Sequence, residues 1–485
     1  MTVQSVLDEI ASRPGAGDII PIINPATEEV IAEFRDGGAA AVDTAVTRAR
    51  ASFTSGVWSG LPGSERAKVL WRVADLIDQH ADELAQIDSL NTGMPYFQAS
   101  MIMSTCAESF RYYAGWCTKL NGIAHDVQQT GGITGAFTTM HAYTLKEPYG
   151  VVGLIFPWNG PVFNACTKLA PALAAGCSCV VKPAEETPLS ALLLERILAE
   201  AGVPDGVVNL VTGYGHTVGA AITAHPGVDK VAFTGSTAVG KQIVQAAGGG
   251  NLKRVALELG GKSPVLIYDD ADVDTAITMA AMGIFIHSGQ GCISGSRIFA
   301  QRNVYEKVVE GVANIANSVK LGAPAEEGVL IGPIISAKQL DQVMGFIDEG
   351  HRDGVEVVAG GKRLDRSGFF VHPTVLTDVA PTARLYQQEI FGPVVAILPF
   401  DDDDEVVALA NDSEYGLAAT AWTKDIGRAH RLAKRLDAGT VTLNCQMVFD
   451  HSMPFGGYKQ SGWGHEWGRD GIESFLKTKT VYAQL

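Results

Sequence analysis

Between residues 60 and 120 the chain carries the hydrophobic spacing of amphipathic helices. In ERAKVLWRVADLIDQHADELAQIDSL, apolar side chains recur every three or four positions, which puts them on one face of a helix. These positions include Val69, Leu70, Val73, Leu76 and Ile77. The stretch Asn91-Thr92-Gly93 ends the run, because asparagine and glycine are common helix stops. The region is therefore predicted to be mostly helical.

From residue 150 on, short continuous apolar runs alternate with helical stretches. The runs VVGLIF, CSCVVKP, VVNLVTG and KVAFTG are typical of buried strands, and LSALLLERILAEAG and STAVGKQIVQAAG are typical of helices. Strands that are apolar on both sides need helices on both faces of their sheet. This part is predicted to be a doubly wound, Rossmann-like domain with a parallel sheet.

Two further patterns extend the prediction. A second α/β series spans about residues 264 to 445 and includes the helix NVYEKVVEGVANIANSVKLG and the strand VVAILPF. The stretch GAFTTMHAYTLKEP (135–148) alternates like a two-sided ribbon that lies outside the main core, and the tail TKTVYAQL is also strand-like. Because exposed strand edges usually find a partner, we expect both segments in subunit contacts.

Composition narrows the function classes. The 485 residues suggest two or three domains. A net charge of −16 argues against nucleic-acid binding and against binding to an anionic membrane. No secretory signal is visible at the start, and no apolar stretch approaches the roughly 20 residues that span a bilayer. Seven cysteines, an odd and small number, fit free thiols in a reducing, cytoplasmic setting.

Two motifs could suggest a metal, but neither favours one. Cys177 and Cys179 form C-x-C inside a Val-rich run without a second Cys/His pair nearby, so both are predicted to be buried strand residues. The run DDDDE (401–405) is predicted to begin a helix, where acids meet the positive end of the helix dipole. Consecutive aspartates also point in diverging directions. No metal site is predicted.

The stretch FTGSTAVGKQ (233–242) resembles a nucleotide-binding loop with one defect. It fits G-x-x-x-x-G-K-[ST] except that Gln242 replaces the hydroxyl that would hold magnesium. It follows a strand and opens a helix, whose terminal amides attract any phosphate. The fingerprint G-x-G-x-x-G is absent, since GYGHTVG (213–219) has one residue too many. An atypical dinucleotide site, with its phosphates near Ser236, is therefore predicted.

Three residues are candidates for catalysis. Cys292 lies in the Gly/Ser-rich loop HSGQGCISGSR, where it is either an accessible nucleophile or a structural cysteine. Glu258 stands in the middle of an otherwise apolar strand, as a general base or as a cap for backbone amides. Asn159 closes the strand in IFPWNGP, as an oxyanion donor or as a turn residue. The residues alone leave these alternatives open.

Seven motifs occur in order along the chain: PWN, KPAEETP, FTGSTAVG, LELGGKSP, GQGCISGSR, EIFGPV and PFGGYKQSG. Together they resemble the aldehyde dehydrogenase superfamily, of the NAD(P)-dependent, oxidising, non-acylating type. The resemblance runs from INPATEEV (23–30) to the tail. It implies an α/β fold with an NAD-binding domain of Rossmann-like type at 1–123 and 149–257 and a catalytic domain at 258–446. A small β-ribbon at 124–148 and the tail at 466–485 would mediate oligomerisation, giving a homodimer or homotetramer.

The resemblance also implies the chemistry. Cys292 would attack the aldehyde carbonyl, and the oxyanion would form against the Asn159 amide and the backbone N–H of Cys292. Hydride transfer to the nicotinamide would leave a thioester, which water activated by Glu258 would hydrolyse to the carboxylic acid. Lys168 matches a lysine sometimes assigned to proton relay, with structural ion pairing as the alternative. No metal is needed.

For the cofactor, the resemblance assigns Lys182 and Glu185 to the adenosine ribose. A carboxylate there accepts from ribose hydroxyls and repels a 2′-phosphate, which favours NAD over NADP. Ser236 matches the pyrophosphate contact. The other implied cofactor contacts are Gly215 and Gly219 on the adenine side, Glu389 and Phe391 at the nicotinamide ribose, and Ile155, Pro157, Trp158, Thr234, Gly235, Val239 and Leu259.

The substrate is predicted to be a small, uncharged and hydrophobic aldehyde. Gly160 and Gly291 should widen the tunnel near the thiol. The expected lining is mostly apolar: Phe163, Ile286, Ile293, Phe449 and Phe455. No arginine stands at these positions to bind a substrate carboxylate. The alternatives are a CoA-acylating dehydrogenase, which has no need of a base such as Glu258, and a catalytically silent NAD-binding or structural relative.

Overall fold

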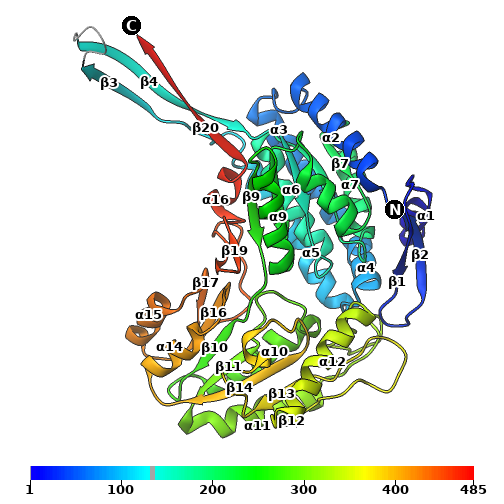
Figure 1. Cartoon of the computed structure of the whole chain (residues 1–485), viewed down its shortest axis with the longest axis vertical. Helices are drawn as coiled ribbons and strands as arrows, with labels where there is room; N and C mark the ends of the chain where they lie inside the picture. Colours follow the sequence, from blue (N-terminus) through cyan, green and yellow to red (C-terminus); the bar gives the residue numbers. More distant parts are fainter. Residues whose placement is uncertain (1, 131–136, 485) are drawn as a thin grey trace.

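Two parallel sheets and a projecting arm organise the molecule (Figure 1). The computed structural model describes residues 2–130 and 137–484, so residues 131–136 of the predicted ribbon lie outside the described residues. The predicted α/β class, with parallel-sheet domains and a small antiparallel element, is confirmed. Among the described residues no helix is long and apolar enough to cross a membrane.

The helical start is confirmed, with one break. The pattern from 64 to 92 suggested one long run, but the chain turns at His80 and forms two helices. The second ends at Thr92 with Gly93 as its cap in the left-handed conformation. The first 115 residues contain α1 Val3–Ser12, β1 Ile19–Ile23, β2 Val30–Arg35, α2 Gly38–Ser55, α3 Gly63–Gln79, α4 Ala81–Thr92 and α5 Tyr96–Ala114.

The first sheet has six strands in the order β19-β9-β8-β5-β6-β7, and all pairs are parallel except β19 with β9. The chain builds outward from β5 to β7 and then returns to place β8 on the other side of β5. Such a reversal opens a ligand crevice at the carboxyl ends of the two strands. The elements are β5 Val151–Ile155, α6 Pro161–Ala175, β6 Ser178–Lys182, α7 Leu189–Ala201, β7 Val208–Leu210, α8 Ala220–Ala224, β8 Lys230–Thr234, α9 Thr237–Gly249, β9 Arg254–Glu258 and β19 Gly462–Trp463.

The second sheet has seven strands in the order β12-β13-β14-β11-β10-β16-β17, and only β12 is antiparallel to its neighbour. Its strands are β10 Pro264–Ile267, β11 Arg297–Gln301, β12 Glu356–Ala359, β13 Thr374–Thr377, β14 Val394–Phe400, β16 Ala418–Trp422 and β17 Thr440–Leu443. Its helices are α10 Val273–Phe285, α11 Tyr305–Ser318, α12 Ala337–Arg352, α13 Arg384–Gln387, α14 Asp403–Asn411 and α15 Ile426–Arg435. The DDDDE prediction is confirmed, because Asp402 caps α14 by accepting from two backbone amides.

The arm is a three-stranded antiparallel sheet that extends away from the rest of the molecule (Figure 1). It consists of β3 Ala124–Thr130, β4 Phe137–Pro148 and β20 Leu476–Gln484. β4 lies in the middle, and β20 pairs with it from Leu476 opposite Pro148 to Gln484 opposite Met140. The predicted ribbon and the predicted strand-like tail are therefore parts of one sheet, and most side chains of β20 are exposed.

The connection between the two main sheets positions the site. β9 ends at Glu258, and after five intervening residues β10 begins the second sheet at Pro264 (Figure 1). The carboxyl edge of the first sheet is thus joined to the amino edge of the second. Glu258 was predicted in the middle of its strand, which is wrong: it is the last strand residue, since Gly260 and Gly261 leave the sheet.

Cysteine placement follows the prediction, with one exception. Cys177 and Cys179 are buried free thiols, as predicted, but only Cys179 is a strand residue, since Cys177 comes one residue before β6. Of the seven cysteines only Cys292 and Cys445 are partly exposed. Within the described residues no group of three or more histidine, cysteine or carboxylate side chains could hold a metal ion.

Candidate active site

The Cys292 loop lies between α10 and β11 and is sharply bent. His287, Ser288 and Gly289 all have positive φ, of 49°, 56° and 69°. A Cβ at Gly289 would collide with the carbonyl oxygen of Gly392, so this close approach requires glycine. Ser288 Oγ donates to the Gly332 carbonyl at 2.7 Å. The loop is therefore held from both sides.

Cys292 is half-buried and lies directly against the segment that follows Glu258. A Cβ at Gly261 would collide with the carbonyl oxygen of Cys292, so the two loops touch backbone to backbone. Burial first, and then the nearby carboxylates of Glu389 and Glu258, raise the pKa of the Cys292 thiol to about 12. The thiol is thus protonated at neutral pH, and it needs a base or a nearby positive charge to become a nucleophile.

Asn159 reaches the cysteine loop from the first sheet. It stands between β5 and α6, and its Nδ2 donates to the Gln290 carbonyl at 2.9 Å, two residues before Cys292. Gln290 is fully buried, and its own Oε1 accepts from the Ile335 amide at 2.9 Å. An amide nitrogen carries two hydrogens, so Asn159 keeps one donor for a ligand oxygen.

A buried charge cluster lies beside Glu258. Lys168, on α6, is 1% exposed and forms an ion pair with Glu466. The Glu258 side chain is 5% exposed, and its Oε2 has no hydrogen-bond partner among the described residues. Burial and the negative Glu466 raise the pKa of Glu258 well above its ordinary value of 4.5, while Lys168 opposes the shift. A carboxyl group with a raised pKa and a free oxygen has the properties of a general base.

The crevice between β5 and β8 gathers several predicted cofactor residues. Ile155 ends β5 and Thr234 ends β8, so Pro157 and Trp158 lie on one side of it and Gly235 and Ser236 on the other. Ser236 caps α9, and its Oγ accepts from the Val239 amide at 3.4 Å. Thr234 Oγ1 is buried and has no partner among the described residues. Leu259 is buried against Gly240 of α9. A helix N-terminus with an orphaned hydroxyl nearby fits a pyrophosphate group.

The residues predicted for the adenosine side are also close together. Lys182 Nζ donates to Glu185 Oε2 at 3.1 Å and to the Pro183 carbonyl at 2.7 Å. The Gly215 amide donates to Glu185 Oε1 at 3.3 Å. A Cβ on Gly219 would lie 3.6 Å from Lys182 Cδ. The Glu185 carboxylate is therefore held in place, which suits a group that accepts from ribose hydroxyls.

Glu389 and Phe391 join the two halves of the site. Glu389 Oε1 accepts from the Gly261 amide at 3.0 Å. Burial raises the pKa of Glu389 to about 7, against the lowering effects of that hydrogen bond and of Lys262. Phe391 has a φ of 57°, and its ring lies edge-on to Trp158 with centroids 5.2 Å apart. The loop before β14 thus contacts both the crevice and the segment after Glu258.

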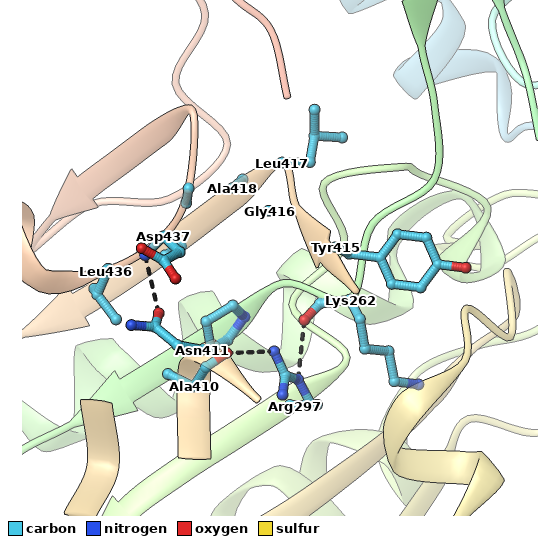
Figure 2. Close-up of a pocket in the computed structure, with 13 residues that line it drawn as sticks. Lys262, Arg297, Ala410, Asn411, Tyr415, Gly416, Leu417, Ala418, Leu436 and Asp437 are labelled. Carbon is cyan, nitrogen blue, oxygen red and sulfur yellow. Dashed lines mark hydrogen bonds between the residues drawn. The ribbon is translucent and has the colours of Figure 1, made fainter. Parts of the chain in front are cut away.

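Arg297, at the start of β11, holds the segment that connects the two sheets (Figure 2). Its Nε donates to the Lys262 carbonyl at 2.9 Å, and its Nη2 donates to the Ala410 carbonyl at 2.8 Å. The guanidinium lies 4.9 Å from the ring centroid of Tyr386 and is 1% exposed. These residues surround a cavity of about 10 Å³, too small for a substrate. Arg297 therefore holds the starts of β10 and β11 together.

Three of the predicted tunnel residues form an aromatic cluster. Phe163 and Phe449 have ring centroids 6.3 Å apart, and both contact Trp467, as does Phe455 at 5.2 Å. A Cβ at Gly160 would lie 3.4 Å from Asn164 Nδ2 and 3.8 Å from Phe163 Cβ, so a side chain there would be in contact with α6 next to the cluster. The other predicted lining residues belong to the cysteine loop and are half-buried: Ile286, Gly291 and Ile293.

Sequence reasoning missed four residues of this site: Gln290, Arg297, Glu466 and Trp467. Gln290 and Arg297 are part of the motif GQGCISGSR, so the motif could have identified them as site residues. Glu466 and Trp467 follow the motif PFGGYKQSG in the stretch WGHEWGRDG, which has no helical or strand periodicity. Only the tertiary structure brings them to Lys168 and to the phenylalanines.

A doubly wound sheet, with a crevice at its strand reversal and a glycine-lined cysteine loop across from it, defines a class of protein: a dinucleotide-binding α/β enzyme. The model of the aldehyde dehydrogenase family matches residues 12–481. The chain therefore belongs to the aldehyde dehydrogenase family and is an NAD-dependent aldehyde dehydrogenase.

Several relatives are similar over nearly the whole chain. Retinal dehydrogenase 2 of Homo sapiens is 43% identical over 472 residues, which cover 97% of this chain and 89% of that protein. Aldehyde dehydrogenase family 2 member C4 of Arabidopsis thaliana is 43% identical, covering 97% and 92%. The NAD+ complex of aldehyde dehydrogenase from Bacillus cereus has a TM-score of 0.95 at 44% identity, covering 100% and 98%. The NAD+ complex of betaine aldehyde dehydrogenase from Staphylococcus aureus has a TM-score of 0.94 at 36% identity, covering 99% and 96%.

Proposed function

We propose that this enzyme oxidises an uncharged, hydrophobic aldehyde to the carboxylic acid with NAD, through a covalent intermediate on Cys292. The observation that carries the proposal is the contact between the two halves of the site. Asn159 Nδ2 lies 2.9 Å from the Gln290 carbonyl, and Glu258 presents an unpaired oxygen nearby. An oxyanion donor, a nucleophile and a base are thus grouped in one place.

The chemistry assigned to these side chains balances. Cys292 Sγ loses its proton to solvent water and bonds to the aldehyde carbon, and the new oxyanion accepts from Asn159 Nδ2 and from the Cys292 amide. When bound, NAD supplies the hydride acceptor, so that the thiohemiacetal becomes a thioester. Glu258 then takes a proton from water, whose oxygen attacks the thioester and releases the acid and the thiol. Lys168 forms an ion pair with Glu466 and orders its side chain, which we propose as a structural role.

Hydrophobic selectivity follows from the side chains around the entrance. Phe163 and Phe455 are half-buried, and Phe449 is 42% exposed, so the aromatic cluster reaches from a buried position to solvent. Such a surface favours apolar ligands with few polar groups. Among the relatives, one is named for retinal and one for betaine aldehyde. The charge of the aldehyde is therefore the property to test.

An aldehyde panel with the purified chain tests the function. We expect kcat/KM, measured by NADH formation, to be at least about tenfold higher with octanal or benzaldehyde than with succinic semialdehyde or betaine aldehyde. Burying the unpaired charge of either of the latter two costs affinity. NADH should appear without CoA and should not increase with it. A requirement for CoA would favour the acylating alternative, and no NADH with any aldehyde would favour the silent one.

The preference for NAD is proposed from Glu185. Its carboxylate is held by Lys182 and the Gly215 amide, where it would accept from ribose hydroxyls and repel a 2′-phosphate. We expect Glu185→Ser to raise kcat/KM with NADP by about tenfold or more and to lower it with NAD, measured by NADH or NADPH absorbance. Glu186→Gln, one residue away, is the matched control and should leave the ratio unchanged. An unaltered ratio in Glu185→Ser would contradict the assignment.

We also propose a homo-oligomer, dimer or tetramer, assembled through the arm. The β20-β4-β3 sheet leaves the outer edges of β3 and β20 without a partner strand among the described residues. Open strand edges in natural proteins are usually paired or covered. We also propose the domain boundaries that the sequence predicts, with the arm as the third unit. Seven free thiols support the cytoplasmic assignment.

A further inference from the structure

Trp467 adopts a backbone conformation that bulky residues almost never take. Its φ is 60° and its ψ is 179°, a region used essentially by glycine alone. Yet its side chain is one of the largest possible and is only 5% exposed. Strain of this kind persists where the surroundings enforce it, and it is concentrated at functional sites. The neighbour on its amino side is Glu466, the partner of buried Lys168.

The indole of Trp467 lies at the centre of the aromatic cluster and contacts its three phenylalanine rings. Its centroid lies 6.0 Å from Phe163, 5.6 Å from Phe449 and 5.2 Å from Phe455, and its Nε1 lies 3.5 Å from Thr167 Oγ1 on α6. Two of these contacts are edge-to-face, the geometry that aromatic pairs prefer. Phe163 comes from α6, whereas Phe449 and Phe455 come from one loop near the carboxyl end, and the Trp467 ring contacts all three.

Backbone hydrogen bonds on both sides of Trp467 hold it in place. Phe455 and Glu466 exchange both hydrogen bonds, N to O at 2.8 and 2.7 Å. The Gly468 amide donates to the His451 carbonyl at 2.8 Å, and His451 Nε2 lies 2.8 Å from the Thr105 carbonyl on α5. The loop that carries Phe449 and Phe455 is therefore tied to the segment around Trp467 and to the helices of the first sheet.

The cluster has an exposed end and a buried end. Its solvent end is an exposed apolar rim, with Met447, Val448 and Phe449 at 37%, 58% and 42% exposure. Its inner end is Trp467, adjacent to Glu466, whose charge acts on both Cys292 and Glu258. Exposed apolar patches that lead into a buried site mark ligand entrances.

We propose that Trp467 is a specificity-determining positioning residue, which arranges Phe163, Phe449 and Phe455 so that the enzyme prefers aldehydes carrying an aromatic ring. The inference rests on the proposed function and narrows its substrate class. A ring entering this cluster gains edge-to-face contacts worth about 2- to 10-fold in affinity for each aromatic pair, beyond the burial that an alkyl chain also gains. These contacts lie away from the reacting carbonyl, so they act on KM and leave kcat unchanged.

The test compares Trp467→Leu with the wild-type enzyme on 3-phenylpropanal and heptanal. We expect the KM for 3-phenylpropanal to rise about tenfold in the variant, while its kcat and both constants for heptanal stay within about threefold. Trp467→Phe keeps a ring and should restore most of the aryl preference. Trp463→Leu removes an exposed tryptophan four residues away and is the matched control, with no change expected. NAD binding, followed by fluorescence, reports whether each variant is folded.

Each outcome has a distinct meaning. Equal KM increases for both aldehydes, or a loss of kcat common to both, would overturn the inference, because Trp467 would then act on general packing or on Glu466. A wild-type enzyme that oxidises aldehydes without an aryl preference would also overturn it. A wild-type enzyme that oxidises no aldehyde would instead refute the proposed function.

Discussion

Replacing Cys292 with alanine is expected to lower aldehyde oxidation by about 10⁴-fold or more, equivalent to about 5.5 kcal/mol of transition-state stabilisation. Without the sulfur there is no covalent intermediate, and the Asn159 amide has no oxyanion to stabilise. NAD should still bind, because the crevice at β5 and β8 is built by other residues. Steady-state NADH formation and equilibrium NAD binding, measured on the same preparation, separate the two effects.

The matched control for this variant is Cys445→Ala. Cys445 is the other partly exposed thiol of the chain, so it would share any general sensitivity of accessible cysteines. The Cys445→Ala variant should retain most of the wild-type activity. Reaction of Cys445 with a thiol reagent that mimics an aldehyde should not protect the enzyme from inactivation. If Cys292→Ala kept more than a few per cent of wild-type turnover, Cys292 would not be the nucleophile.

Glu258→Gln is expected to slow turnover by about 10²- to 10⁴-fold while leaving hydride transfer largely intact. The amide has nearly the same shape but cannot take a proton from water, so the thioester on Cys292 should accumulate. Rapid mixing should therefore show a burst of one NADH per active site, followed by a slow steady state. Intact-protein mass spectrometry should detect the acylated chain. A variant that loses the burst as well would show that Glu258 acts before hydride transfer.

The pH dependence of thioester hydrolysis is a second test of Glu258 as the general base. Its pKa is raised well above 4.5 by burial and by Glu466, so at low pH the group is neutral and cannot act as a base. The rate of thioester hydrolysis in the wild-type enzyme should therefore rise with pH as the carboxyl ionises, with a midpoint above the ordinary range of a glutamate. In Glu258→Gln this rise should be absent. Asn159→Ala keeps Glu258 and serves as the control, slower but with the rise preserved.

Much of the fold was predictable because its signals are local. The strands of the first sheet are continuous apolar runs, and each catalytic candidate stands in a short motif at the end of a strand or in a glycine-rich loop. Burial of the C-x-C pair and capping by Asp402 follow from side-chain chemistry within a few residues. Such features depend on near neighbours and can be read from a window of sequence.

What could not be predicted depends on pairing across long separations. The arm joins Gln484 to Met140, and nothing in either strand specifies the other. Glu258 was placed in mid-strand because VALEL reads as one apolar run, whereas the strand ends where Gly261 must approach Cys292. Glu466 has no motif of its own, and its importance comes from Lys168, almost 300 residues earlier.

The way in which the carboxyl-terminal segment returns to the first sheet has a consequence for biosynthesis. β19 adds to the edge of β9, pairing Gly462 with Glu258, and the Leu259 amide donates to the Ser461 carbonyl at 2.8 Å. Ser461 and Gly462 stand near the carboxyl end of the sequence, so the edge of β9 beside the base stays unpaired until nearly the whole chain has left the ribosome. The core of the first sheet also includes Ile472 and Phe475, so this half of the molecule is completed only when synthesis ends.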